Sequence, residues 1–193
     1  MYALIENNAV TKVGELATLF PDTSNPNHAF AIEQGALEVV EGEQKDQRFY
    51  WVTFDSYQIN GNVVTRTYTN TPKALEDKLE TKEDGSPLYV QVFDATICRH
   101  GEMVNTTEQV VTKGLKSQWI AQVKASANSQ LASTDWMVIR KAERDVAIPT
   151  DVATYRAAVI TEYNRLKTAI EGTNSVEDLI TVVGSQNWPT NAI

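Results

Sequence analysis

The chain has 193 residues, of which 42% are hydrophobic and 22% charged, a balance that predicts a globular fold of one medium domain or two small ones. A formal net charge of −8, with no cluster of lysine and arginine, argues against a partner held by phosphate neutralisation, so no nucleic acid is expected. Apolar runs stay well short of the roughly 20 residues that cross a bilayer, so no membrane partner is expected either.

The first 42 residues read as strands joined by turns. Two short apolar stretches flank Asn7-Asn8 within residues 1–13, and this pattern is typical of a β-hairpin. Turn-forming side chains fill residues 20–27, which should be a surface loop. Residues 36–40 should form a short strand that Gly42 ends.

The clearest hairpin signal lies at Asn60-Gly61. Aromatic and β-branched residues are frequent in the stretches 49–54 and 57–59 before it and 63–68 after it, and an Asn-Gly pair supplies the positive φ angle that a tight turn requires. Residues 73–85 are charged and should be a short helix or a linker. Alternation in residues 88–93, followed by a turn at 100–102, then predicts a second hairpin, which either joins the first sheet or forms a small one of its own.

From Thr106 onward the apolar spacing becomes helical. Thr106 and Gln109 have the spacing of a capping box, and Ser133-Thr134-Asp135 should end the first helix. A second helix should begin at Pro149-Thr150 and end at Gly172 in the left-handed conformation. A third, short helix should follow Ser175, and the two long helices should pair as a hairpin because each has one apolar stripe. The first stripe is Leu115, Trp119, Val123, Ala127 and Leu131, and the second is Val152, Tyr155, Val159, Tyr163, Leu166 and Ile170.

These periodicities predict an α+β fold in which an antiparallel β-rich N-terminal module precedes a helical hairpin and a short third helix. The expected divisions are residues 1–72 for the β-rich module, 73–105 for a linker with an additional hairpin, and 106–193 for the helical domain.

The sequence shows no motif for metal, cofactor or catalytic chemistry. Cys98 is the single cysteine, which excludes an internal disulfide, and with His100 and the distant His28 it gives too few ligands for a zinc site. We therefore expect an inert thiol, no cofactor and no metal. A G-x-S-x-G elbow, a phosphate-binding loop, G-x-G-x-x-G and H-E-x-x-H are all missing, so a non-enzymatic protein is expected.

Two spaced signatures flank a proline-containing connector near the C-terminus. The first is the apolar run 131–140 with Asp135-Trp136, and the second is the segment 154–159 with Tyr155-Arg156. Together they resemble the C-terminal signature of the bacteriophage tail-fibre assembly and tail-assembly-chaperone family. More loosely, the hairpin of residues 1–13, Phe20-Pro21, Glu41-Gly42 and residues 57–66 are similar to the N-terminal strand module of small phage virion proteins.

The resemblance implies a non-enzymatic tail protein that binds a tail-fibre or baseplate protein, either as a structural part of the virion tail or as a fibre assembly factor. It implies synthesis in the host cytoplasm, a place on the virion tail and a possible symmetric oligomer. The residues that it suggests for partner binding are Trp119, Asp135, Trp136, Tyr155 and Arg156.

Simpler roles for the signature residues stay open. The Trp136 ring, placed just after the predicted helix end, could be buried in the core as a plug. Asp135 would then be a helix cap or an ion-pair partner of Arg140 or Arg156. Tyr155 and Arg156 then place an aromatic ring in the hairpin core and a charge at its edge.

Two other functions stay open. One is a receptor- or glycan-binding module of the tail, which is favoured if Trp51, Tyr57 and Tyr68 are exposed together. The other is a glycan hydrolase, which needs two carboxyl groups roughly 5 to 10 Å apart.

Overall fold

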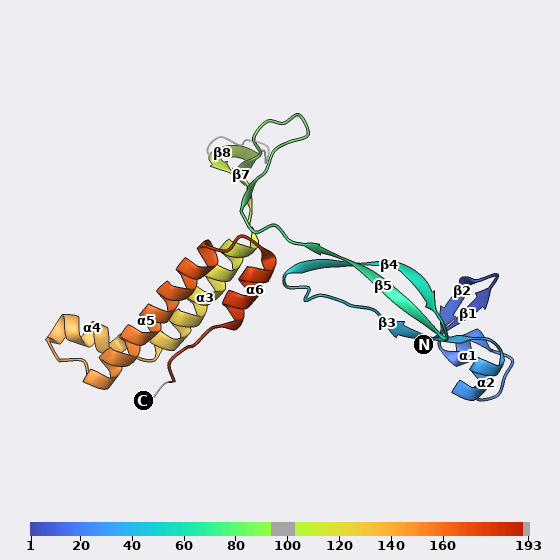
Figure 1. Ribbon diagram of the computed structural model, residues 1–193. Coiled ribbons are helices and arrows are strands. Elements are labelled where there is room, and N and C mark those ends of the chain that lie inside the picture. The colour runs from blue at the N-terminus through green and yellow to red at the C-terminus, as the bar shows by residue number, and fades with distance from the viewer. Residues whose placement is uncertain (94–102, 191–193) are drawn as a thin grey trace. The chain divides into compact units, whose positions relative to one another are not determined.

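The computed structural model describes residues 1–93 and 103–190 and has the mixed α+β composition that the sequence predicts (Figure 1). The chain divides into two compact units, Met1–Pro72 and Lys73–Ile193. The boundary expected between residues 105 and 106 falls inside strand β8, Met103–Gln109, so the additional hairpin and the helices belong to the same unit.

The first unit is a curled five-stranded sheet with the strand order β2-β1-β3-β5-β4. Its strands are β1 Tyr2–Glu6, β2 Ala9–Gly14, β3 Leu37–Glu41, β4 Tyr50–Asn60 and β5 Val63–Pro72. The prediction of a wholly antiparallel module is wrong, because β3 pairs in parallel with β5. The connection after β3 carries the chain to the outer strand β4, and the β4–β5 hairpin returns β5 between them in the direction of β3.

Two short helices precede β3, and the sequence analysis did not predict them. They are α1 Leu16–Leu19 and α2 His28–Glu33, and α2 begins where the Asn27 side chain accepts a hydrogen bond from the Phe30 N–H at 2.9 Å. Residues between these helices form the predicted loop of turns and bends.

Both predicted hairpin turns are present in the first unit. Asn7 and Asn8 have φ angles of 49° and 60° and join β1 to β2. The second turn is Gly61-Asn62 rather than Asn60-Gly61, because Asn60 pairs with Val63 as the last residue of β4. Gly61 is the first of the two central turn residues and has a φ angle of 60°. A two-residue hairpin turn with a positive φ angle at this position favours glycine there.

Two small antiparallel ladders open the second unit. Strand β6, Lys78–Leu79, pairs with β9, Val111–Thr112, while β7, Tyr89–Phe93, pairs with β8. The predicted second hairpin is thus confirmed as a ladder of its own, and its predicted turn at 100–102 lies outside the described residues. The helix predicted to start at Thr106 is wrong, because residues 103–109 alternate along β8, where Asn105 lies opposite Gln91. Residues 73–85 contain no helix, in agreement with the linker alternative.

The helices are α3 Leu115–Ala132, α4 Asp135–Arg144, α5 Thr150–Glu171 and α6 Val176–Gly184. Helices α3 and α5 pack as the predicted hairpin, with α6 against α5 (Figure 1). Ser175 caps α6 as predicted, since its hydroxyl accepts a hydrogen bond from the Asp178 N–H at 3.0 Å. The two packed stripes are buried at Leu115, Trp119, Val123 and Ala127 of α3 and at Val152, Tyr155, Val159, Leu166 and Ile170 of α5.

The end of α3 at Ser133 is confirmed, whereas the predicted left-handed end of α5 is wrong. Gly172 has a φ angle of −79°, so it is not left-handed. The hydroxyl of buried Thr173 instead satisfies the Ile170 carbonyl at 2.8 Å, and this side-chain cap makes a left-handed residue unnecessary. Helix α4 was not predicted, because Ser133-Thr134-Asp135 both ends α3 and starts the next helix.

The start of α3 is held by the segment that leads into the unit. Asp77 accepts a hydrogen bond from the Gly114 N–H at 2.9 Å, and the Leu115 N–H donates to the Ala74 carbonyl at 2.9 Å. Gly114 is confined there, because a methyl group at its Cα would overlap the backbone carbonyls of Leu75 and Glu76. The segment 74–77 thus supplies acceptors for amides that the helix itself leaves unpaired.

Candidate protein-binding surface

Arg156 ties three helices together at the junction between α3 and α4. Its Nη1 donates to the Leu131 carbonyl at 3.0 Å and to the Thr134 hydroxyl at 2.6 Å, and it lies 2.9 Å from the Asp135 carboxylate. Thr134 is only 2% exposed, and its hydroxyl donates a hydrogen bond to the Leu131 carbonyl at 2.9 Å. One guanidinium on α5 therefore binds the last turn of α3 and the first residue of α4.

Of the two ion pairs considered for Asp135, the structure has the one with Arg156. Arg140 instead lies over the Trp136 ring, with 4.8 Å between the guanidinium carbon and the ring centroid. Because Arg156 is mostly buried and Asp135 half exposed, this pair connects the hairpin interior to the protein surface.

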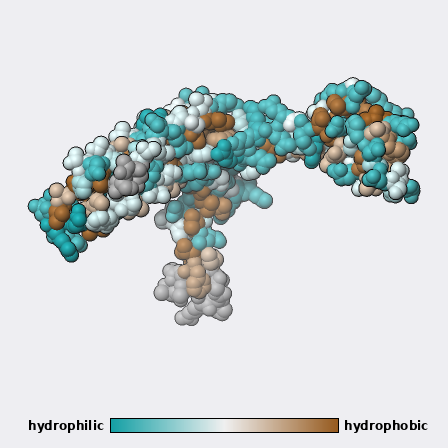
Figure 2. Space-filling model, turned by 90° about the horizontal axis from the view of Figure 1, so that it is seen from below, coloured by the Kyte–Doolittle hydropathy of each residue, from teal (hydrophilic) through white to brown (hydrophobic). Residues whose placement is uncertain are grey.

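Helix α4 exposes large apolar side chains beside charged ones, and none of its ten residues is fully buried. Trp136 is 51% exposed and Ile139 57% exposed, and both lie on the face defined by Trp136, Ile139, Arg140 and Glu143, hereafter the α4 face. These positions are three, four and seven residues apart, which places them on one side of a helix. Figure 2 shows apolar surface among hydrophilic surface at this end of the second unit.

A shallow pocket follows the α4 face. It has a volume of about 320 Å³ and is lined by the α4 face together with Arg144. The interpretation of Trp136 as a core plug is wrong, because α3 and α5 fill their interface with their own stripes and leave this ring on the outer side of α4. Tryptophan and arginine are both enriched among the residues that carry most of the binding energy at protein interfaces.

Trp119 and Tyr155 lie in the hairpin core, so they do not offer a binding surface in this conformation. Trp119 belongs to the buried stripe of α3. Tyr155 packs with Ala127 and Val159 in a cluster against which partly buried hydrophobic residues rest. Those residues are Leu131, Tyr163 and Trp188. Of the five predicted binding residues, Trp136 thus lies on the α4 face, Asp135 and Arg156 position it, and Trp119 and Tyr155 support the hairpin.

A buried carboxylate tethers the C-terminal segment and was missed in the sequence analysis. Glu162 accepts hydrogen bonds from Arg165 at 2.7 Å and from the Asn187 N–H at 2.7 Å, and Arg165 also donates to the Ser185 carbonyl at 2.9 Å. The hydrogen bond from Arg165 is the main cause that lowers the pKa of Glu162. The sequence did carry a signal for this buried position, because Glu162 lies three residues after Val159 and four before Leu166 and thus falls on the buried stripe of α5.

The aromatic residues of the first unit are not gathered into one exposed group. Trp51 is 64% exposed, but it lies on the opposite face of β4 from Phe54. Tyr57 and Tyr68 are half-buried and contact the Phe54 ring, with centroid distances of 5.0 and 6.4 Å. The condition that favoured a glycan-binding surface is therefore not met by these three aromatics.

Residues 1–93 and 103–190 contain no cluster of three side chains suited to a metal ion. In the same ranges, none of the helices combines the length and apolar character that crossing a membrane requires. Cys98 and His100 lie outside the described residues. Comparison with protein-family models, curated proteins and solved structures finds no match for the chain.

Proposed function

We propose that this chain is a non-enzymatic bacteriophage tail protein that binds a tail-fibre or baseplate protein through the α4 face. The observation that carries the proposal is the exposure of Trp136 and Ile139 on a helix without buried residues. A helix whose large apolar side chains stay about half exposed gains stability when a partner covers them. The first part of the sequence signature that resembles tail-fibre assembly proteins, residues 131–140, includes Asp135-Trp136 in the same region.

The geometry around α4 supports a preorganised surface. Arg156 fixes the first turn of α4 through Thr134 and Asp135, and Asp145 ends the helix in a left-handed conformation with a φ angle of 55°. Binding to a helix that is already fixed costs less conformational entropy than binding that has to order the helix first. Fibre subunits expose hydrophobic surface before they trimerise, and a preformed helix face with exposed Trp136 and Ile139 suits such a partner.

The test is capture of the partner from an infected-cell lysate by the tagged full-length chain. The wild-type chain should retain a tail-fibre or baseplate protein. Trp136→Ala and Ile139→Ser should each weaken that capture at least tenfold, because anchors at the centre of an interface carry about 2 kcal/mol or more.

The matched control is Ile160→Ser on α5, which removes an apolar side chain of similar exposure away from α4. It should bind like the wild type. Equal capture by all three variants would show that the α4 face does not contact the partner. Retention of neither fibre nor baseplate protein by the wild type would refute the proposed function.

A further inference from the structure

Strand β4 forms an open edge of the first unit. It ends the strand order β2-β1-β3-β5-β4, and its ladder with β5 starts from the two-residue turn at Asn60↔Val63. Residue pairs next to such a turn alternate between those that exchange backbone hydrogen bonds and those that do not. The non-bonded pairs include Tyr50↔Pro72, which agrees with the missing N–H of proline. The other non-bonded pairs contain four residues of β4, namely Val52, Phe54, Tyr57 and Ile59. The backbone N–H and C=O groups of these residues point away from β5.

The side chains of these four residues share one face of the strand. The ladder shifts register between Phe54 and Tyr57, because Asp55 and Ser56 form a bulge. Phe54 lies opposite Tyr68 and Tyr57 opposite Arg66, and the guanidinium of Arg66 stacks over both Phe54 and Tyr68. The outer edge of β4 therefore combines outward backbone groups with an apolar face.

This edge carries little of the protection that sheets place on their margins. Lysine, proline, inward charges and β-bulges usually keep edge strands from pairing, and of these β4 has the bulge at Asp55-Ser56. Between Val52 and Ile59 the one charged residue is Asp55, inside the bulge. Phe54 is 42% exposed on the face that the other three residues share.

The spacing along β4 selects its partner. A regular strand has outward backbone groups every second residue, whereas β4 has three residues from Phe54 to Tyr57 because of the bulge. A regular strand therefore matches the flank on one side of the bulge and loses register on the other. A strand with the same bulge, placed antiparallel, matches both flanks.

We propose that the occupant of this edge is β4 of a second copy of the chain, in a two-fold symmetric dimer. With the axis between Asp55 and Ser56, Phe54 of each copy faces Tyr57 of the other, and Val52 faces Ile59. Outward backbone groups then meet outward backbone groups, and apolar side chains meet on one face. Such an isologous pairing is the usual symmetry of a dimer.

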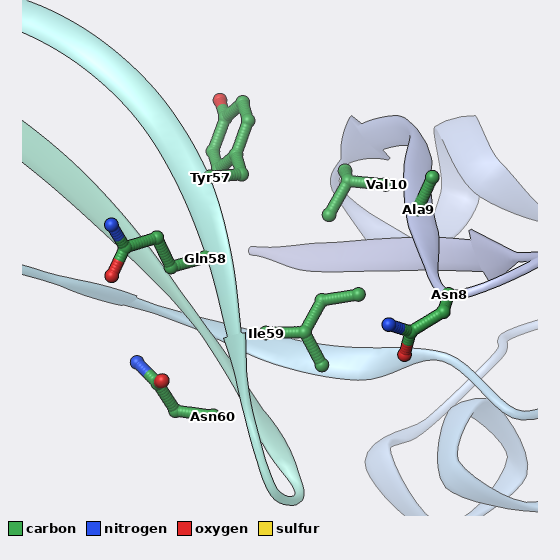
Figure 3. A pocket seen from close by; sticks show the side chains of 7 residues that line it. All are labelled: Asn8, Ala9, Val10, Tyr57, Gln58, Ile59 and Asn60. Atoms are coloured by element: carbon green, nitrogen blue, oxygen red, sulfur yellow. The ribbon is translucent and has the colours of Figure 1, made fainter.

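At the Ile59 end, strand β2 comes close to β4, so the space there admits a side chain of the second copy rather than a whole strand between them. A pocket of about 600 Å³ separates β4 from the β1–β2 turn, and Asn8, Val10, Tyr57 and Ile59 are among its lining residues (Figure 3). Figure 3 shows Ile59 on the side of β4 toward Asn8 and Val10, with Gln58 and Asn60 on the other side. Val52 of the second copy would enter this pocket opposite Ile59.

Complementation between two variants of the full-length chain tests the register. Phe54→Glu and Tyr57→Lys should each weaken self-association roughly tenfold or more in sedimentation equilibrium, since each replaces two apolar cross-strand pairs per dimer. An equimolar mixture should recover the dimer, because the substituted glutamate of one copy then faces the substituted lysine of the other. Thr69→Lys, exposed on β5, is the matched control and should dimerise like the wild type.

Amide hydrogen exchange on the wild type tests the same edge without a substitution. The amides of Val52, Phe54, Tyr57 and Ile59 should exchange more slowly as protein concentration rises, whereas those of Thr53 and Gln58, which already bond to β5, should not change. A chain that stays monomeric at every concentration overturns the proposal. So does a dimer that survives both single variants, or one whose edge amides are insensitive to concentration.

Discussion

Removal of the Arg156 guanidinium should separate the α3–α4 junction from α5. Arg156→Ala deletes two hydrogen bonds from a charged donor, to the Leu131 carbonyl and the Thr134 hydroxyl, and one ion pair with Asp135. Charged hydrogen bonds contribute about 1.5 to 3 kcal/mol each, but water replaces part of this at a side chain that is not fully buried. The pair with half-exposed Asp135 adds at most about 1 kcal/mol. We therefore expect a loss of about 2 to 4 kcal/mol in the free energy of unfolding.

Urea denaturation at neutral pH, followed by circular dichroism, measures this loss. Arg156→Lys serves as the comparison, because it keeps the charge without the planar fork and should lose about half as much. Amide exchange should rise selectively in α4, whose first turn depends on this side chain. A free energy within about 0.5 kcal/mol of the wild type for Arg156→Ala would refute the role of the guanidinium as the anchor of α4.

Three further outcomes follow from the second unit. Trp119→Ala should cost about 3 to 5 kcal/mol of stability and Trp136→Ala less than about 1 kcal/mol in urea titrations; similar losses would contradict their opposite burial. Gly114→Ala should destabilise the chain by more than about 1 kcal/mol, since its methyl group meets backbone that cannot yield, and an unchanged denaturation midpoint would argue against the tight approach of residues 75–76. Glu162, whose pKa Arg165 lowers, stabilises the fold above the ordinary carboxyl pKa, and this contribution is lost as pH falls through the lowered value. Acid titration of stability below about pH 4.5 should therefore be shallower in Glu162→Gln, and identical slopes would count against the role of this carboxylate.

Local patterns predicted the elements whose contacts are close in sequence. Apolar residues at every fourth position predicted the buried stripe of α3 from Leu115 to Ala127. The residue pairs Asn7-Asn8 and Asn60-Gly61 predicted the two hairpins of the first unit. The parallel pairing of β3 with β5 depends on the position in the sheet that the chain takes up after residue 42. No local sequence pattern indicates that position.

The candidate surface was predicted in part. The Asp135–Arg156 pair was among the alternatives, because both charges sit at helix ends that a hairpin brings together. The exposure of Trp136 was not predicted, since a tryptophan beside a helix end has the same sequence signal whether α4 continues beyond it or the ring turns into the core. Only the packing of α3 against α5 decides between them.

The central claim is that the chain serves a phage tail by binding another tail protein. Mass spectrometry of purified particles from the source virus, together with affinity capture from the infected lysate, tests this most directly. Recovery in particles at a small multiple of three or six copies, or capture with fibre or baseplate protein in the lysate alone, is the predicted result. Absence from the particles together with no tail protein in the captured material would contradict the account.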